Sequence, residues 1–69
     1  MDPKAPDPEH IMQFFAFDHL PDRLQAVSRP FGVLAEVIVV TLPRNPERTV
    51  ALRKLLESKD AAVRALVAK

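Results

Sequence analysis

The sequence contains no cysteine, no tryptophan, no tyrosine and only one glycine. The lack of cysteine excludes disulfide bonds and thiolate zinc sites. The two histidines, His10 and His19, are too few to complete a structural zinc site. A chain of 69 residues forms one small domain, which buries a modest fraction of its surface and is marginally stable without support. We therefore expect further copies of the chain to provide that support.

Long apolar runs and a secretion signal are also missing. The run VIVV at 37–40 is far too short to span a bilayer. The N-terminus, MDPKAPDPEH, lacks a basic region followed by an apolar stretch. These absences predict a soluble cytoplasmic protein without a membrane segment.

The charge is nearly balanced overall but unevenly distributed. Residues 1–22 carry five acids and one lysine, a net charge of −4, whereas residues 23–69 carry nine basic and four acidic residues, a net charge of +5. The sum, +1, is too mild for a dedicated DNA-binding protein. A basic body of this kind suits a small anionic ligand better.

The spacing of apolar residues predicts a first helix over about residues 21–42. Pro21 and Asp22 are favourable in a first helical turn. Pro30 should remove a backbone hydrogen bond and kink or restart the helix near Ser28. One face carries apolar residues in steps of four and three: Leu20, Leu24, Val27, Phe31, Leu34 and Ile38.

A second apolar stripe runs beside the first and consists of Val33, Val37 and Val40. A helix that is apolar nearly all round is buried nearly all round, and one partner helix cannot cover both stripes. Either neighbouring copies cover the second stripe, or the aromatic N-terminal segment folds over it within one chain.

A turn and a second helix follow. Pro43 ends the first helix, because the residue before a proline avoids helical geometry. Asn45 is a favourable N-cap, and Pro46 and Glu47 favour a first helical turn. The second helix is expected over about residues 46–68, with a core stripe of Leu52, Leu55 or Leu56, the stem of Lys59, Val63 and Leu66.

The predicted fold is therefore all-α. Residues 20–69 form an antiparallel αα-hairpin. Residues 1–19, which contain prolines, acids and three phenylalanines, form an extended arm. Its aromatic part, residues 11–17, is either extended or a short turn that lies on an apolar surface. Copies of the hairpin assemble into a homo-oligomeric helical bundle.

Basic residues cluster around the start of the second helix. Arg44 and Arg48 flank the helix start, where the N-terminus offers free N–H groups. Arg53 and Lys54 lie about two turns inside the helix, and Thr49 adds a hydroxyl. Guanidinium groups match phosphate or carboxylate oxygens, so an anion site is one interpretation, and ordinary solvent exposure is the other. His19, which follows Phe17, is placed to stack on a base, to donate to a phosphate, to cap the helix or to lie exposed.

No catalytic set is present in the sequence. It has no cysteine nucleophile, no glycine-rich phosphate loop and no spacing of metal ligands. Glu47 and Glu57 are separated by nearly three helical turns. We expect a protein that is not an enzyme and that uses no cofactor or metal.

Several short motifs resemble the helical hairpin domain of small phage proteins that counter CBASS and Thoeris immunity by sequestering cyclic nucleotide signals. In that domain an acid, a Ser or Thr and Ala-Leu-x-Lys-Leu precede further acids and alanines. An aromatic-x-aromatic segment with His-x-Pro precedes the first helix, here as FAFDHLP over 15–21 with Asp18 inserted. The matching positions of the second helix are Glu47, Thr49, Ala51, Leu52, Lys54, Leu55, Glu57, Ala61 and Ala62.

This resemblance, over roughly residues 15–66, implies a homo-oligomer, a hexamer or smaller, that binds ligands between protomers. The ligand would be a cyclic oligonucleotide or a cyclic ADP-ribose-type signal in an infected bacterial host. Phe17 and His19 would stack on bases, Arg48, Arg53 and Lys54 would hold phosphates, and Thr49 would offer its hydroxyl.

Two other functions compete with this one. A small helical oligomeric phage protein could serve as a protein–protein interaction module, with its arginines solvated or paired to a partner. Weak nucleic-acid binding by the basic face is the less favoured alternative and predicts a steep salt dependence.

Overall fold

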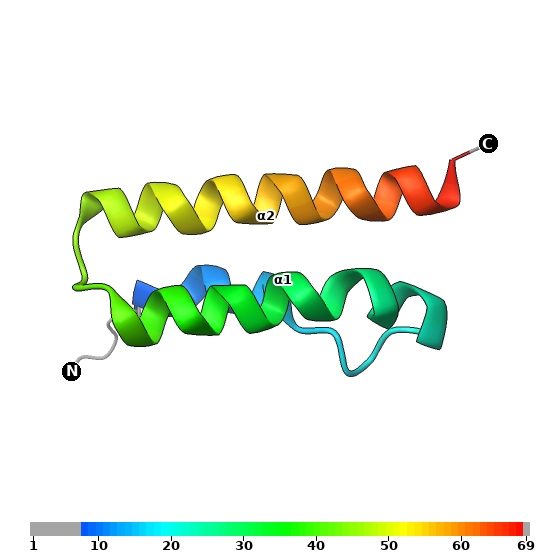
Figure 1. Ribbon diagram of the computed structural model, residues 1–69, viewed down its shortest axis with the longest axis horizontal. Coiled ribbons are helices and arrows are strands. Elements are labelled where there is room, and N and C mark those ends of the chain that lie inside the picture. Colours follow the sequence, from blue (N-terminus) through cyan, green and yellow to red (C-terminus); the bar gives the residue numbers. More distant parts are fainter. Residues whose placement is uncertain (1–7, 69) are drawn as a thin grey trace.

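The computed structural model describes residues 8–68, and the side chains of residues 10–68. This part of the chain is all-helical, as predicted. It contains a 3₁₀-helix, η1 (Pro8–Phe15), and two long helices, α1 (Asp22–Thr41) and α2 (Pro46–Val67). The two long helices pack side by side in opposite directions and form a hairpin, and η1 lies alongside them (Figure 1).

The aromatic part of the N-terminal segment forms a short helical turn against the core, the second of the two forms that we expected, and is not extended. Residues 8–15 are helical, and the helix brings Phe15 into the core, where 2% of its surface remains exposed. Ile11 and Met12 pack against the same core from η1. Burial of one apolar side of the segment favours a compact turn over an extended strand, since a strand would point alternate side chains away. Residues 1–7 of the expected arm lie outside the described residues.

Helix α1 runs through Pro30 without interruption, so the helix does not restart near Ser28, and the alternative, a kink near Pro30, stays a prediction. A proline inside a helix removes one backbone hydrogen bond, and its ring crowds the carbonyl four residues earlier. The side chains of Phe31, Ile38 and Val39 pack against the core and hold the helix after that position. Tertiary packing thus outweighs the local defect.

The core is small and differs in part from the predicted stripe. Among the described residues, the buried apolar side chains are Phe15, Ala35 and Leu52. Leu34, expected in the core, is 47% exposed, while the small residues Ser28 and Gly32 are buried. A Cβ atom on Gly32 would lie 2.9 Å from ring carbons of Phe17, so glycine permits this close approach. The aromatic segment therefore occupies the small-residue side of α1.

Helix α2 follows the sequence prediction closely. Leu52 is buried, Leu55 and Leu56 pack against the core, and the side chain of Lys59 is only 13% exposed. The predicted cap is also confirmed: the Asn45 side chain accepts a hydrogen bond of 2.9 Å from the backbone N–H of Arg48.

Three basic side chains donate hydrogen bonds to backbone carbonyls at or near the C-terminal ends of the three helices. Arg48 donates to Val39 O and Leu42 O beside the end of α1, at 3.1 and 3.2 Å. Lys59 Nζ donates to Phe14 O in η1 at 2.6 Å, and Arg23 makes a longer contact of 3.5 Å with Leu66 O in α2. The last carbonyls of a helix lack intrahelical donors and carry the negative end of its dipole, so cations are favourable there.

The molecule is thin, with extents of 43 × 22 × 17 Å. A helix with its side chains is about 10 Å wide, so this cross-section holds two helices and η1 but no further layer. Each long helix consequently keeps one long side open to solvent.

Ser28 supplies a first prediction, because its Oγ is fully buried and has no hydrogen-bond partner among the residues that the structure describes. Ser28→Ala should raise the free energy of unfolding by about 1 kcal/mol or more, since it removes a buried unsatisfied hydroxyl and adds helix propensity. Urea unfolding followed by circular dichroism measures this change.

Ser58→Ala is the matched control, because Ser58 is exposed on α2 and gains helix propensity alone, about 0.5 kcal/mol. Equal gains in the two variants would show that the Ser28 hydroxyl is satisfied in solution.

Candidate functional site

Arg48, one of the predicted phosphate-binding residues, lies in the first turn of α2, next to the loop that joins the two long helices. Its side chain is engaged by the carbonyls of Val39 and Leu42, and only 8% of its surface is exposed. Asn45 and Pro46 start α2 so that Arg48 falls in the first turn, facing back to the end of α1. Arg48 therefore has a structural role that the sequence interpretation missed.

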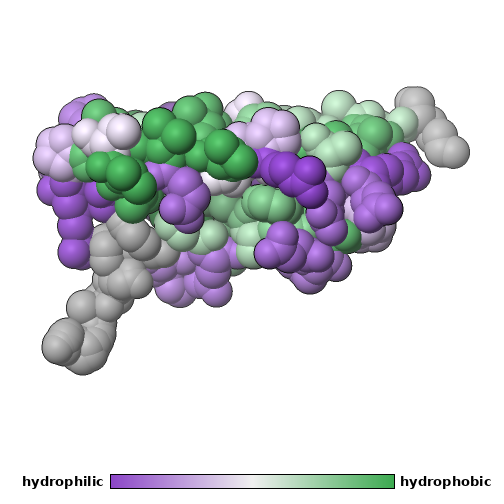
Figure 2. Space-filling view, turned by 60° about the horizontal axis from the view of Figure 1, so that its bottom comes forward, coloured by the Kyte–Doolittle hydropathy of each residue, from purple (hydrophilic) through white to green (hydrophobic). Residues whose placement is uncertain are grey.

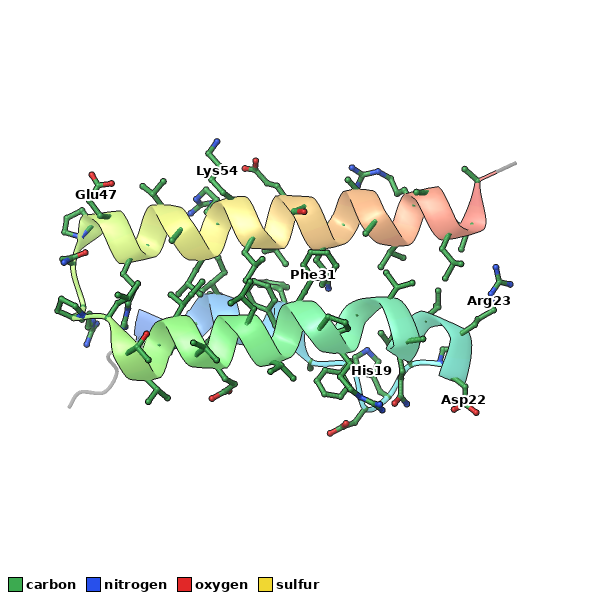
Figure 3. The ribbon with its side chains drawn as sticks, in the orientation of Figure 1. His19, Asp22, Arg23, Phe31, Glu47 and Lys54 are labelled. Carbon is green, nitrogen blue, oxygen red and sulfur yellow. The ribbon has the colours of Figure 1, made fainter. Side chains whose placement is uncertain are left out.

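Phe17 and His19 lie in the loop between η1 and α1. The Phe17 ring packs on Gly32, and the guanidinium carbon of Arg29 lies 5.5 Å from the ring centroid. This distance is within the range of a cation–π contact. His19 is exposed, and Figure 3 shows it on the side of α1 that faces away from α2. The half-buried Phe17 ring thus lies against the middle of α1, and His19 is exposed two residues further along the same loop.

Thr49, Arg53 and Lys54 occupy exposed positions of α2. Lys54 Nζ is 3.7 Å from a Glu57 oxygen, and both side chains are more than half exposed, so this ion pair contributes little to stability. The Thr49 hydroxyl donates to Asn45 O at 3.4 Å. Figure 3 shows Lys54 pointing away from α1, on the side of the hairpin opposite His19.

The predicted site residues are therefore not gathered within one chain. Phe17 packs on Gly32 of α1. His19 lies on the side of α1 that faces away from α2, while Lys54 lies on the opposite side of the hairpin (Figure 3). Arg48 lies between the helices at the turn, where its guanidinium is held by backbone oxygens. A ligand that touched both groups would need residues from more than one copy.

A cavity of about 260 Å³ lies between the N-terminal segment and α1. Phe17 and Gly32 form part of its wall, and the carboxyl-bearing residues Asp18 and Glu36 also line it. Two carboxylates disfavour a phosphate, so this cavity is not the expected anion site. Sequence reasoning missed Glu36 here, because only the tertiary fold brings the aromatic loop against that turn of α1.

The open side of α1 is apolar. Val33, Val37 and Val40 are 54%, 47% and 77% exposed, so the aromatic segment, as far as it is described, does not cover the second stripe. Figure 2 shows apolar side chains gathered toward the end of the molecule that carries the α1–α2 turn. By length and composition α1 is also apolar enough to cross a membrane, a property shared with core helices of soluble proteins.

Among residues 10–68, no group of three His, Asp or Glu side chains is close enough together to hold a metal ion. Comparisons with known protein families, curated proteins and solved structures gave no match. The resemblance to the phage hairpin domain thus remains a prediction from the motifs.

The structural role of Arg48 leads to a second prediction. Arg48→Met should lower the free energy of unfolding by about 2 kcal/mol, because the carbonyls of Val39 and Leu42 lose a charged donor. Urea unfolding at one fixed protein concentration measures the loss.

Arg53→Met is the control, since Arg53 is exposed on the same helix and its replacement should change stability by less than about 0.5 kcal/mol. Losses of similar size in the two variants would refute the proposed role of Arg48.

Proposed function

We propose that the protein acts as a homo-oligomer that binds an anionic cyclic nucleotide signal at surfaces shared between copies, and sequesters it without catalysis. The observation that carries this proposal is the separation of two exposed ligand-type side chains, His19 and Lys54, on opposite sides of a thin hairpin. The uncovered apolar side of α1 supports it further, since that side needs a neighbour. The motif resemblance supplies the class of ligand.

The chemistry of a shared site would divide between the two groups. Phe17 and His19 of one copy would stack on a base, since every base has an aromatic face. Arg53 and Lys54 of another copy would hold phosphates, Arg53 through its planar fork and Lys54 as a point charge. Thr49 would add a hydroxyl near the phosphates. Arg48 is left out of this contact set, because its guanidinium is engaged with α1.

Sequestration requires binding alone. A ligand bound in a shared site is withdrawn from solution in proportion to the number of sites and their affinity. Such a protein would act in the cytoplasm of an infected bacterial host, where the immune signal is made.

Native mass spectrometry provides the third prediction. The purified protein should form a discrete oligomer that gains whole ligands from a panel of a cyclic dinucleotide, a cyclic trinucleotide and cyclic ADP-ribose. Arg53→Ala should weaken the binding at least about tenfold, because a charge-assisted hydrogen bond contributes about 1.5–3 kcal/mol.

Arg64→Ala removes the same charge from an exposed position nearer the C-terminal end of α2, and should leave the affinity unchanged. An oligomer that takes up none of the ligands would refute the sponge. Equal losses in both variants would indicate a nonspecific charge effect instead of a site at Arg53.

A protein–protein interaction module is the second candidate, and the exposed valines of α1 favour it specifically. It predicts an assembly without affinity for cyclic nucleotides. Nucleic-acid binding would show instead as an affinity that increases with strand length and decreases steeply with salt.

A further inference from the structure

The open side of α1 has a regular pattern, which we call the outer seam: Ala26, Pro30, Val33, Val37 and Val40. All five residues are exposed, and they follow one another in steps of four, three, four and three. This spacing places them in one line along a helix and matches the seam by which two helices pack together. The buried residues Ser28, Gly32 and Ala35 lie on the opposite side of α1, which is already occupied.

Two opposite charges flank one edge of this seam, seven residues apart. Arg29 is exposed. Its guanidinium donates a hydrogen bond of 3.1 Å to Gln25 Oε1, lies over Phe17, and forms no ion pair with a carboxylate among the described residues. Glu36 is exposed as well, and it forms no ion pair with any described residue. The other edge of the seam carries Leu34 and Thr41, which have no charge.

We propose that a second copy of this chain docks on the outer seam, with the two α1 helices antiparallel and Arg29 of each copy beside Glu36 of the other. This inference rests on the homo-oligomer of the proposed function and identifies one of its interfaces. In a two-fold symmetric pair, a contact from residue i to residue j is always accompanied by the contact from j to i. One symmetric arrangement therefore makes the Arg29–Glu36 pair twice.

The antiparallel direction follows from the charges. In a parallel pair, residues at the charged edge of one helix face the other edge of its partner. Arg29 and Glu36 would then face Leu34 and Thr41, and the two charges would be partly buried without pairing. Reversing the partner places the charged edges together, so that unlike charges meet.

The shapes of the side chains fit the same arrangement. The register that aligns Arg29 with Glu36 also sets Val33 against Pro30 and Val37 against Ala26 of the second copy. Val37 then meets the small side chain of Ala26 across the seam, which allows the helices to approach closely at that level. The added contact would supplement a core that, among the described residues, buries only three apolar side chains.

The absence of cysteine makes a direct test of direction possible. Single variants Val33→Cys and Val40→Cys, treated with a short bismaleimide, report whether each position lies next to its own copy. In the proposed pair the two Val33 positions lie near the symmetry axis, whereas the two Val40 positions are separated by about 25 Å along the helices. The expected result is a covalent dimer from Val33→Cys and none from Val40→Cys.

Charge reversal tests the pairing. Glu36→Arg alone and Arg29→Glu alone should each raise the dissociation constant of the dimer about tenfold in sedimentation experiments, because like charges then face each other. The double variant Arg29→Glu with Glu36→Arg should restore the original value. Glu57→Arg, which reverses an exposed acid on α2, is the control and should have no effect.

Each other outcome overturns a distinct part of the inference. Cross-linking of Val40→Cys as readily as Val33→Cys would show a parallel pair. If the protein forms an oligomer that cross-links at neither position, and if the charge reversals leave its dissociation constant unchanged, then the interface lies elsewhere. The proposed function would remain intact. A monomer would overturn both proposals, and a monomer that floats with phosphatidylcholine–phosphatidylglycerol vesicles would show that lipid covers the seam.

Discussion

The fold depends on hydrogen bonds from basic side chains to the carbonyls at helix C-termini. Arg48 is the most important of these, because it lies in the first turn of α2 and reaches carbonyls of Val39 and Leu42 at the end of α1. Asn45 caps the same turn of α2 by accepting a hydrogen bond from the Arg48 backbone N–H. Free backbone groups at the start of α2 and at the end of α1 thus find hydrogen-bond partners at one place. Lys59 does the same for η1 through Phe14 O. The positive charge of the hairpin is thus used in part to complete its own backbone.

These hydrogen bonds give part of the excess of basic residues in 23–69 a structural role. The turn looked like an anion site because several basic residues gather there, but the buried one faces carbonyls. The exposed residues Arg53 and Lys54 remain available to a ligand or a partner. A carbonyl oxygen and a phosphate oxygen attract guanidinium for the same reason, and local sequence alone does not distinguish a basic residue that caps a helix from one that binds a ligand.

The second consequence concerns the size of the core. The aromatic segment covers the small-residue side of α1 through Phe15 and Phe17, and α2 covers a neighbouring side. With those sides filled, nothing that the structure describes covers Val33, Val37 and Val40. Both proposals start from this uncovered apolar side of α1. A thin hairpin with such a side gains stability from a neighbouring copy, and by itself it encloses a ligand poorly.

The sequence by itself determined the two helices, the proline- and asparagine-containing turn and the core stripe of α2, because periodicity and capping depend on residues a few positions apart. It also identified the second apolar stripe of α1. The tertiary structure decided which side of α1 is buried, the helical form of residues 8–15, and the separation of His19 from Lys54. It also decided that Arg48 faces backbone oxygens. These features depend on contacts between residues far apart in the chain, such as Phe17 with Gly32 and Lys59 with Phe14, and no local pattern specifies such contacts.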